Sequence, residues 1–143
     1  MSAPAPTEPR PGRVRELTRS ECFELLAGVQ VGRVAVTDDR GPVVFPVNFV
    51  LDRHTVVFRT ETGTKLHAAC RASRACFEAD GTDDAARTGW SVIVHGEIVA
   101  VTDPAELARL RGLPLRPWLS GARSHYVRIL PAALTGRRIM PAG

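Results

Sequence analysis

The stretch Phe58–Leu66, which reads FRTETGTKL, holds the residues best suited to bind a ligand. Gly63 marks a turn after a β-branched and aromatic run, and a helical pattern follows, so Thr64 and Lys65 should open a helix. The first backbone N–H groups of a helix lack partners inside the helix and carry partial positive charge. A hydroxyl, an ammonium group and such N–H groups at one turn suit a phosphate. The stretch is therefore predicted to be a phosphate-binding turn.

Lys65 is the only lysine of the chain, and every other member of its 19 basic residues is an arginine. An ammonium group is a compact point charge, whereas a guanidinium group is a planar fork. One ammonium group at a helix start therefore favours a site for a single anionic group. The alternative is an ordinary surface loop in which the lysine occurs by chance.

Other familiar sites for chemistry are missing from the sequence. A Walker loop would need a glycine at position 58, where Phe58 stands, and no three spaced glycines follow a strand as a dinucleotide fingerprint requires. Neither a Ser-His-Asp nor a Cys-His set can be assembled from the order of the residues, so no catalytic residue is assigned. The histidines and cysteines lack metal-ligand and disulfide spacing, and we expect no metal site among them: His54, His67, His95, His125, Cys22, Cys70 and Cys76.

Alternating and β-branched runs predict the strands that position the turn. These runs are Val31–Thr37, Pro42–Val50, Thr55–Thr60, Ser73–Asp80, Trp90–Val101 and Tyr126–Leu130, with a loop over residues 81–89, and Leu134–Ile139 could form a last short strand. Short connections favour antiparallel pairing, as in the hairpin across Asp38–Gly41. Pro46 would place its strand at an edge, at a bulge, or facing something other than another strand, and Gly96 would mark a bend or a close approach of backbone. About six antiparallel strands with three brief helices indicate a mainly β protein, a small closed or partly closed β-barrel.

Capping signals predict the other two helices. Thr18 and Glu21 have the spacing of a capping box, an apolar stripe that includes Cys22 follows them, and Gly28 should end the helix. Asp103 should cap a helix that begins at residue 104 and runs to about residue 111. Residues 113–121 are proline-rich and should be irregular.

Length and composition indicate one domain. Residues 1–15 hold four prolines and few large apolar side chains, so we expect a flexible tail, followed by a single domain over residues 16–143. No apolar run approaches the roughly 20 residues of a membrane span, and no signal peptide is recognisable, so we expect a cytoplasmic protein. Half of the net charge of +4 lies in residues 1–15, and the arginines of the rest are scattered rather than clustered with aromatics, which argues against nucleic-acid binding.

Several phrases together resemble a known family. They are GPVVFPVN over residues 41–48, FRT and GTKL within residues 58–66, GWSV with Gly96 in residues 89–96, and TGRRI over residues 135–139. In this order and spacing the chain, from about Leu17 to Ile139, resembles the flavin-binding split-barrel proteins related to pyridoxamine 5'-phosphate oxidase. The resemblance is to their short bacterial branch, which includes nitroimidazole-reducing proteins. It implies an FMN-binding split β-barrel that forms a homodimer.

The resemblance also implies which residues hold the flavin, in two sites that the subunits share. The amide of Asn48 and the backbone of Pro46 and Val47 would meet the polar edge of the ring, and Arg59 and Thr60 would contact ring or phosphate. Thr64 and Lys65 would grip the phosphate, and Trp90 and Ser91 would lie near the ring, from the other subunit. Phe58, Gly63 and Leu66 complete the predicted set.

The function implied by the resemblance is an FMN-dependent oxidoreductase that passes hydride from a reduced donor to a small-molecule acceptor. The alternatives are a non-catalytic binding or storage protein for flavin, deazaflavin or haem, with FAD a further possible cofactor, and a structural barrel whose site has decayed. The true oxidases carry a C-terminal arginine motif, for which Arg128, Arg137 and Arg138 are candidates only by charge, so oxidation of pyridoxamine phosphate is not expected. Trp118 could wall the substrate side or cover a barrel end, and Tyr126 could donate to a ligand or only pack.

Overall fold

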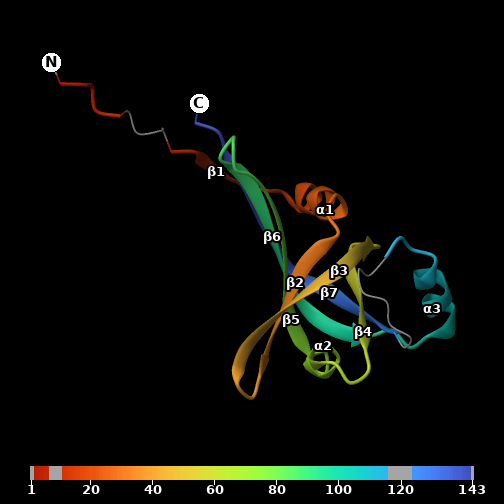
Figure 1. Cartoon of the computed structure of the whole chain (residues 1–143). Coiled ribbons are helices and arrows are strands. Elements are labelled where there is room, and N and C mark those ends of the chain that lie inside the picture. Colours follow the sequence, from red (N-terminus) through yellow and green to blue (C-terminus); the bar gives the residue numbers. More distant parts are fainter. Residues whose placement is uncertain (1, 7–10, 116–123, 143) are drawn as a thin grey trace.

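The computed structural model describes residues 2–6, 11–115 and 124–142, and within them the chain forms seven strands and three helices (Figure 1). The elements are β1 (Arg13–Glu16), α1 (Arg19–Ala27), β2 (Val31–Asp38), β3 (Gly41–Asp52), β4 (Thr55–Glu61), α2 (Lys65–Ala69), β5 (Arg74–Asp83), β6 (Thr88–Ala100), α3 (Pro104–Arg111) and β7 (Ser124–Met140). The fold is mainly β, as predicted. Trp118 lies outside the described residues.

The strands form one antiparallel sheet that closes on itself. Their order is β1-β7-β4-β3-β2-β5-β6, and β7 pairs with β6 as well as with β4, so the two ends of the sheet meet. The predicted hairpin is present, with β2 and β3 paired from Val31↔Asn48 to Asp38↔Gly41. The predicted small barrel is therefore confirmed.

One face of each strand fills the barrel. Along β3 the alternation predicted from the sequence is present, with Phe49 buried and Val44 61% exposed. The largest fully buried side chains of this core include Phe58, Phe77 and Leu26. The β3–β4 ladder ends at Phe49↔Phe58, so at Pro46 only β2 pairs with β3, which explains how a proline is accommodated there.

A second, smaller core lies between α3 and the outer face of β4 and β7. It is made of Val57, Leu110, Leu115 and Tyr126. Tyr126 is only 8% exposed, so the side chain packs under α3 rather than projecting into solvent.

The helix boundaries follow the predicted caps. Thr18 and Glu21 form the capping box of α1, and Gly28 is its C-cap. Asp103 caps α3 by accepting a hydrogen bond from the backbone N–H of Glu106. No helix in the described parts of the chain combines the length and the apolar character needed to cross a bilayer.

The C-terminal strands differ from the prediction. The two strands expected on either side of Pro131 are one strand, β7, because a bulge absorbs the proline: His95 pairs with Ala133 and Gly96 with Pro131, which leaves Ala132 as the extra residue. The loop predicted over residues 81–89 is likewise shorter, since β5 and β6 pair as far as Asp83↔Thr88.

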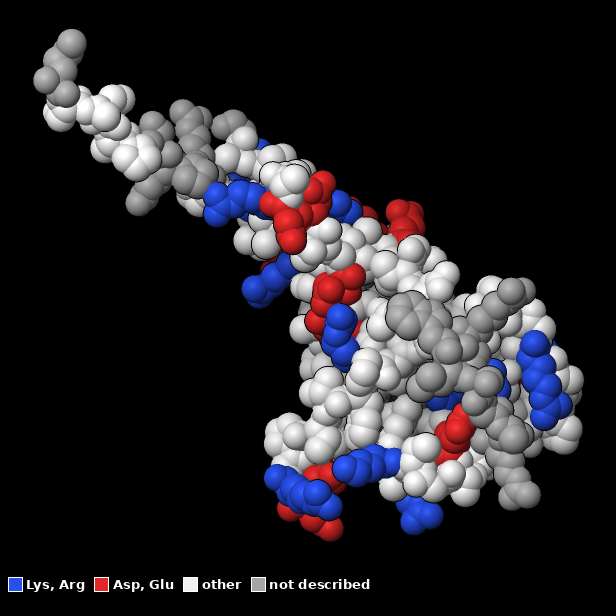
Figure 2. All heavy atoms as spheres, in the orientation of Figure 1, with Lys and Arg blue, Asp and Glu red and all other residues white. Residues whose placement is uncertain are grey.

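The far ends of β5, β6 and β7 extend beyond the barrel, and β1 adds to them (Figure 1). We call this extension the arm: β1 with residues 80–91 and 137–140. β1 begins at Arg13, inside the segment predicted as tail, and pairs with β7 from Arg13↔Met140 to Glu16↔Arg137. Figure 2 shows the elongated outline and, on the face that it displays, acidic and basic side chains interspersed.

Candidate functional site

The predicted phosphate-binding turn joins β4 to α2. Gly63 has φ +88°, a conformation that favours glycine, and a Cβ added there would meet no described atom within 4 Å. The hydroxyl of Thr64 donates to the carbonyl of Glu61 at 2.7 Å and accepts from the N–H of His67 at 3.1 Å. Thr64 is thus the N-cap of α2, and open space adjoins the turn.

Any attraction of this turn for anions would come from the ammonium group of Lys65 rather than from the helix itself. α2 has only five residues, none of them buried, so few aligned peptide dipoles contribute. Lys65 occupies the first helical position and is exposed. Leu66 turns inward and packs against the barrel core. The exposed Lys65 is therefore followed directly by a residue, Leu66, that packs against the core.

The structure brings the predicted residues of β3 beside the end of β4 that leads into this turn. Phe49↔Phe58 is the last pair of the β3–β4 ladder, so Asn48 and Arg59 are the next residues of two adjacent strands. Asn48 is half-buried, and Pro46 is exposed. Val47 is 6% exposed and Phe58 is fully buried, so these two can offer a ligand only their backbone.

Arg59 and Thr60 point to opposite faces of β4, as neighbouring residues of a strand must. The guanidinium group of Arg59 lies 5.7 Å from the centre of the Tyr126 ring, on the side of the second core. Thr60 faces the barrel interior, is 2% exposed, and its hydroxyl lies 2.8 Å from Nδ1 of His67. The Thr60 hydroxyl therefore already has a protein partner.

Two histidines, His67 of α2 and His125 of β7, meet beside this turn. The rings of His67 and His125 lie 4.6 Å apart at an interplanar angle of 39°. Nε2 of His125 is 2.7 Å from the hydroxyl of Thr62. We call Thr60, Thr62, His67 and His125 the histidine clasp. The sequence shows only that His67 lies three residues after the cap Thr64. His125 is brought close by the pairing of β4 with β7, which places it opposite Thr60.

Trp90 and Ser91 are not in the turn; both lie on β6, in the arm. Trp90 is in the arm, paired with Gly81 and Arg138, and a Cβ on Gly81 would come within 2.6 Å of the indole Nε1. Gly81 stands seven residues along β5 from Arg74, the first residue of the strand after α2. At ~3.3 Å per residue this separates the Trp90 region from the start of β5 by about 23 Å.

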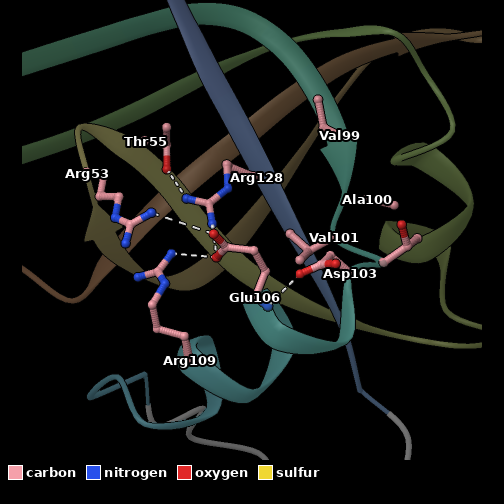
Figure 3. A pocket seen from close by; sticks show the side chains of 10 residues that line it. Arg53, Thr55, Val99, Ala100, Val101, Asp103, Glu106, Arg109 and Arg128 are labelled. Atoms are coloured by element: carbon pink, nitrogen blue, oxygen red, sulfur yellow. Dashed lines mark hydrogen bonds and ion pairs between the residues drawn. The ribbon is translucent and has the colours of Figure 1, made fainter.

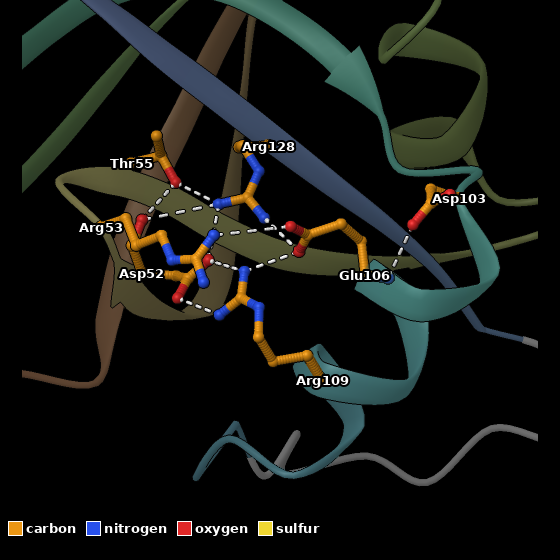
Figure 4. A network of polar contacts seen from close by, with 7 residues as sticks. All are labelled: Asp52, Arg53, Thr55, Asp103, Glu106, Arg109 and Arg128. Carbon is orange, nitrogen blue, oxygen red and sulfur yellow. Dashed lines mark hydrogen bonds and ion pairs between the residues drawn. The ribbon is translucent and has the colours of Figure 1, made fainter.

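A second polar cluster surrounds Asp52, at the end of β3 (Figure 4). Arg109 donates to both carboxylate oxygens of Asp52 at 2.7 Å, and Arg128 donates to one of them at 2.8 Å. Glu106 accepts from Arg109 at 2.6 Å. Hydrogen bonds from Arg109 first, and then from Arg128, hold the pKa of Asp52 well below its usual range, although burial opposes this shift. The network fastens α3 to the barrel.

The hollow beside this network, of about 400 Å³, is lined by Arg53, Arg128 and Glu106 among others (Figure 3). Arg128, a candidate substrate contact by charge, is instead held by the carboxylate and carbonyl of Asp52 and by the hydroxyl of Thr55. Arg137 and Arg138 lie in the arm, opposite Ser91 and Trp90.

Comparisons with known proteins agree on one family. The sequence pattern described as pyridoxamine 5'-phosphate oxidase matches residues 18–138. The structure of an FAD binding protein from Mycobacterium smegmatis is 43% identical, with a TM-score of 0.78, over 87% of this chain and 99% of that one. An FAD-binding protein from Mesorhizobium loti is 26% identical, with a TM-score of 0.73, over 89% and 97%. An uncharacterized protein from Mycobacterium tuberculosis is 40% identical over 132 residues, 89% of this chain and 86% of that protein.

Proposed function

The chain belongs to the pyridoxamine 5'-phosphate oxidase family, and from this premise we propose that it is a flavin-dependent oxidoreductase. The observation that carries the proposal is the exposed Lys65 in the turn after β4, the strand on which Arg59 lies next to Asn48 of β3, in a chain 43% identical to an FAD binding protein. A bound flavin would supply hydride transfer from a reduced donor to a small-molecule acceptor. The protein would supply placement and electrostatics, which fits the lack of an assigned acid–base pair.

The residues around the turn fit a phosphorylated flavin. Lys65 is exposed two residues after Gly63, where an added Cβ would meet no described atom within 4 Å, so we propose that a phosphate approaches there. Asn48 carries both a donor and an acceptor, which suits the polar edge of a flavin ring, and Pro46 and Val47 would add backbone contacts. Arg59 would add a second positive charge one strand away from Asn48.

The sequence prediction of FMN is narrower than the comparisons support. Two relatives are described as FAD binding proteins, and FAD contains the same first phosphate as FMN. We propose that this first phosphate lies at Lys65 whichever nucleotide is bound. Chromatography of the flavin released by heating the purified protein distinguishes FAD from FMN, and a colourless protein that takes up neither would refute the proposal.

Phosphate specificity tests the assigned role of Lys65. Replacing Lys65 by alanine should weaken FMN binding by roughly 1.5–3 kcal/mol, the range for hydrogen bonds to charged groups, and leave riboflavin binding almost unchanged. Arg40→Ala, which removes an exposed cation from the β2–β3 turn, is the matched control. Titrations followed by flavin fluorescence give both affinities. Equal losses for FMN and riboflavin would show that Lys65 does not hold the phosphate.

We also propose a homodimer with shared sites, because Trp90 lies in the arm rather than in the turn at Lys65. Trp90 pairs with Gly81, which lies about 23 Å along β5 from Arg74, the first residue of the strand after α2, and we propose that Trp90 reaches the flavin ring from a second copy. A mixed dimer of Lys65→Ala and Trp90→Ala chains tests this arrangement. Sharing predicts one intact site in two, whereas a site made within one chain predicts two defective sites.

Turnover tests the catalytic part of the proposal. Anaerobic addition of NADPH or another reduced donor should bleach the flavin absorbance, and a small acceptor should restore it. A flavin that no donor reduces would make the protein a binding or storage protein.

A further inference from the structure

The histidine clasp joins the short helix α2 to the barrel. Nδ1 of His67 meets the hydroxyl of Thr60, the His67 ring contacts the ring of His125, and Nε2 of His125 meets the hydroxyl of Thr62. Thr60 lies in β4 and Thr62 in the turn just after it, so the contacts form a closed circuit through β4 with its turn, α2 and β7. His67, the member of the circuit that belongs to α2, is therefore in contact with both β4 and β7.

α2 needs such support because it is short. A helix of one turn is unstable alone, and α2 has no buried residue of its own. Its apolar attachment is the partial burial of Leu66, Ala69 and Cys70 against the core. A small rotation of the helix on these few contacts would move Lys65, which precedes His67 by two residues.

We propose that His67 is a positioning residue for the flavin phosphate: through Thr60 and His125 it fixes α2, and hence Lys65, against the barrel. This inference rests on the proposed function. Thr60 is 2% exposed, so removing the His67 ring would leave a buried hydroxyl without this hydrogen-bond partner, which is unfavourable. The energy of that buried contact thereby opposes rotation of the helix.

The two histidines use different ring nitrogens, which permits a crossed rescue experiment. The side-chain amide of asparagine lies near the position of Nδ1, and the longer glutamine places its amide near Nε2. His67→Asn should therefore keep the contact with Thr60, whereas His67→Gln and His67→Ala should lose it. His125 uses Nε2, so His125→Gln should keep the contact with Thr62, whereas His125→Asn and His125→Ala should lose it.

The expected effect is confined to phosphorylated flavins. His67→Ala and His67→Gln should lower FMN affinity about 3- to 10-fold, the range for one hydrogen bond, and leave riboflavin affinity within about twofold. His67→Asn should stay within about twofold of the wild type for both. His95→Ala, at an exposed histidine of β6, is the control and should change neither affinity.

A second measurement needs no flavin. Hydrogen exchange at the N–H groups of Ala68 and Cys70, which bond to Thr64 and Leu66, reports directly on α2 in the apo protein. Exchange at both should accelerate in His67→Ala and not in His67→Asn. Unchanged exchange in His67→Ala would overturn the inference that the clasp fixes the helix.

The outcomes separate the two proposals. A wild-type protein that binds no flavin would overturn the proposed function, and His67 would then have no phosphate to position. A wild-type protein that binds FMN, with His67→Ala unchanged, would overturn the positioning role alone. Equal loss of FMN and riboflavin in His67→Ala would also overturn it, because a general structural defect does not discriminate by phosphate.

Discussion

Replacement of Asp52 by alanine should destabilise the fold by about 2–4 kcal/mol. Asp52 is 6% exposed and accepts three short hydrogen bonds from Arg109 and Arg128. Breaking a buried ion pair costs ~3–5 kcal/mol when the remaining charge is left without a partner. Here Glu106 still accepts from Arg109, and Arg128 keeps Thr55, so the expected loss is somewhat smaller.

Urea unfolding followed by circular dichroism measures this loss. The midpoint should fall while the slope m stays unchanged, because the same surface is exposed on unfolding. Asp84→Ala, an equivalent change in the exposed β5–β6 turn, should stay within ~0.5 kcal/mol of the wild type. If the two variants shift the midpoint equally, the network does not fasten α3.

The same variant has a defined pH dependence. The pKa of Asp52 is lowered in the folded protein, so its contribution is complete well above the unfolded value of ~3.9 and is lost as the pH falls below it. The difference in unfolding free energy between wild type and Asp52→Ala should therefore be constant from about pH 7 to pH 5 and shrink below about pH 4. A difference that grows in acid would contradict the assignment.

Two further substitutions test the framework around the site. Gly96→Ala should destabilise the protein by about 1–3 kcal/mol, since a Cβ would clash with the carbonyl of Leu130 at the bulge, and a thermal midpoint equal to that of wild type would exclude this close approach. Thr18→Ala should cost about 1 kcal/mol by removing the cap of α1, and Thr18→Ser should restore most of it; equal stability of the two variants would show that the capping bond is unimportant.

The parts of the fold set by local signals could be predicted from the sequence. The capping box at Thr18, the N-cap at Asp103 and the hairpin across Asp38–Gly41 depend on residues within a few positions of one another. The proline at position 131 misled the prediction of β7, because the bulge that accommodates it requires Gly96 on another strand. Local sequence does not reveal that pairing.

In the candidate site, too, local features could be predicted from the sequence and contacts between distant segments could not. The turn at Gly63, Thr64 and Lys65 is a continuous segment and was predicted as a helix start. The contact between Thr60 and His67 requires knowledge of which face of β4 points inward, and the contact with His125 requires the register of β4 with β7. The sequence therefore located the cationic turn and not the side chains that support it.

The long strand β7 has a consequence for how the protein forms during synthesis. β7 pairs with β1, β4 and β6, and all three leave the ribosome before it does. Until residues 124–140 emerge, β4 and β6 each present an unpaired edge, which can template aggregation. Contacts as distant as Arg13↔Met140 also make closure slow. The nascent chain should therefore depend on chaperones during a late window of translation, before β7 is available.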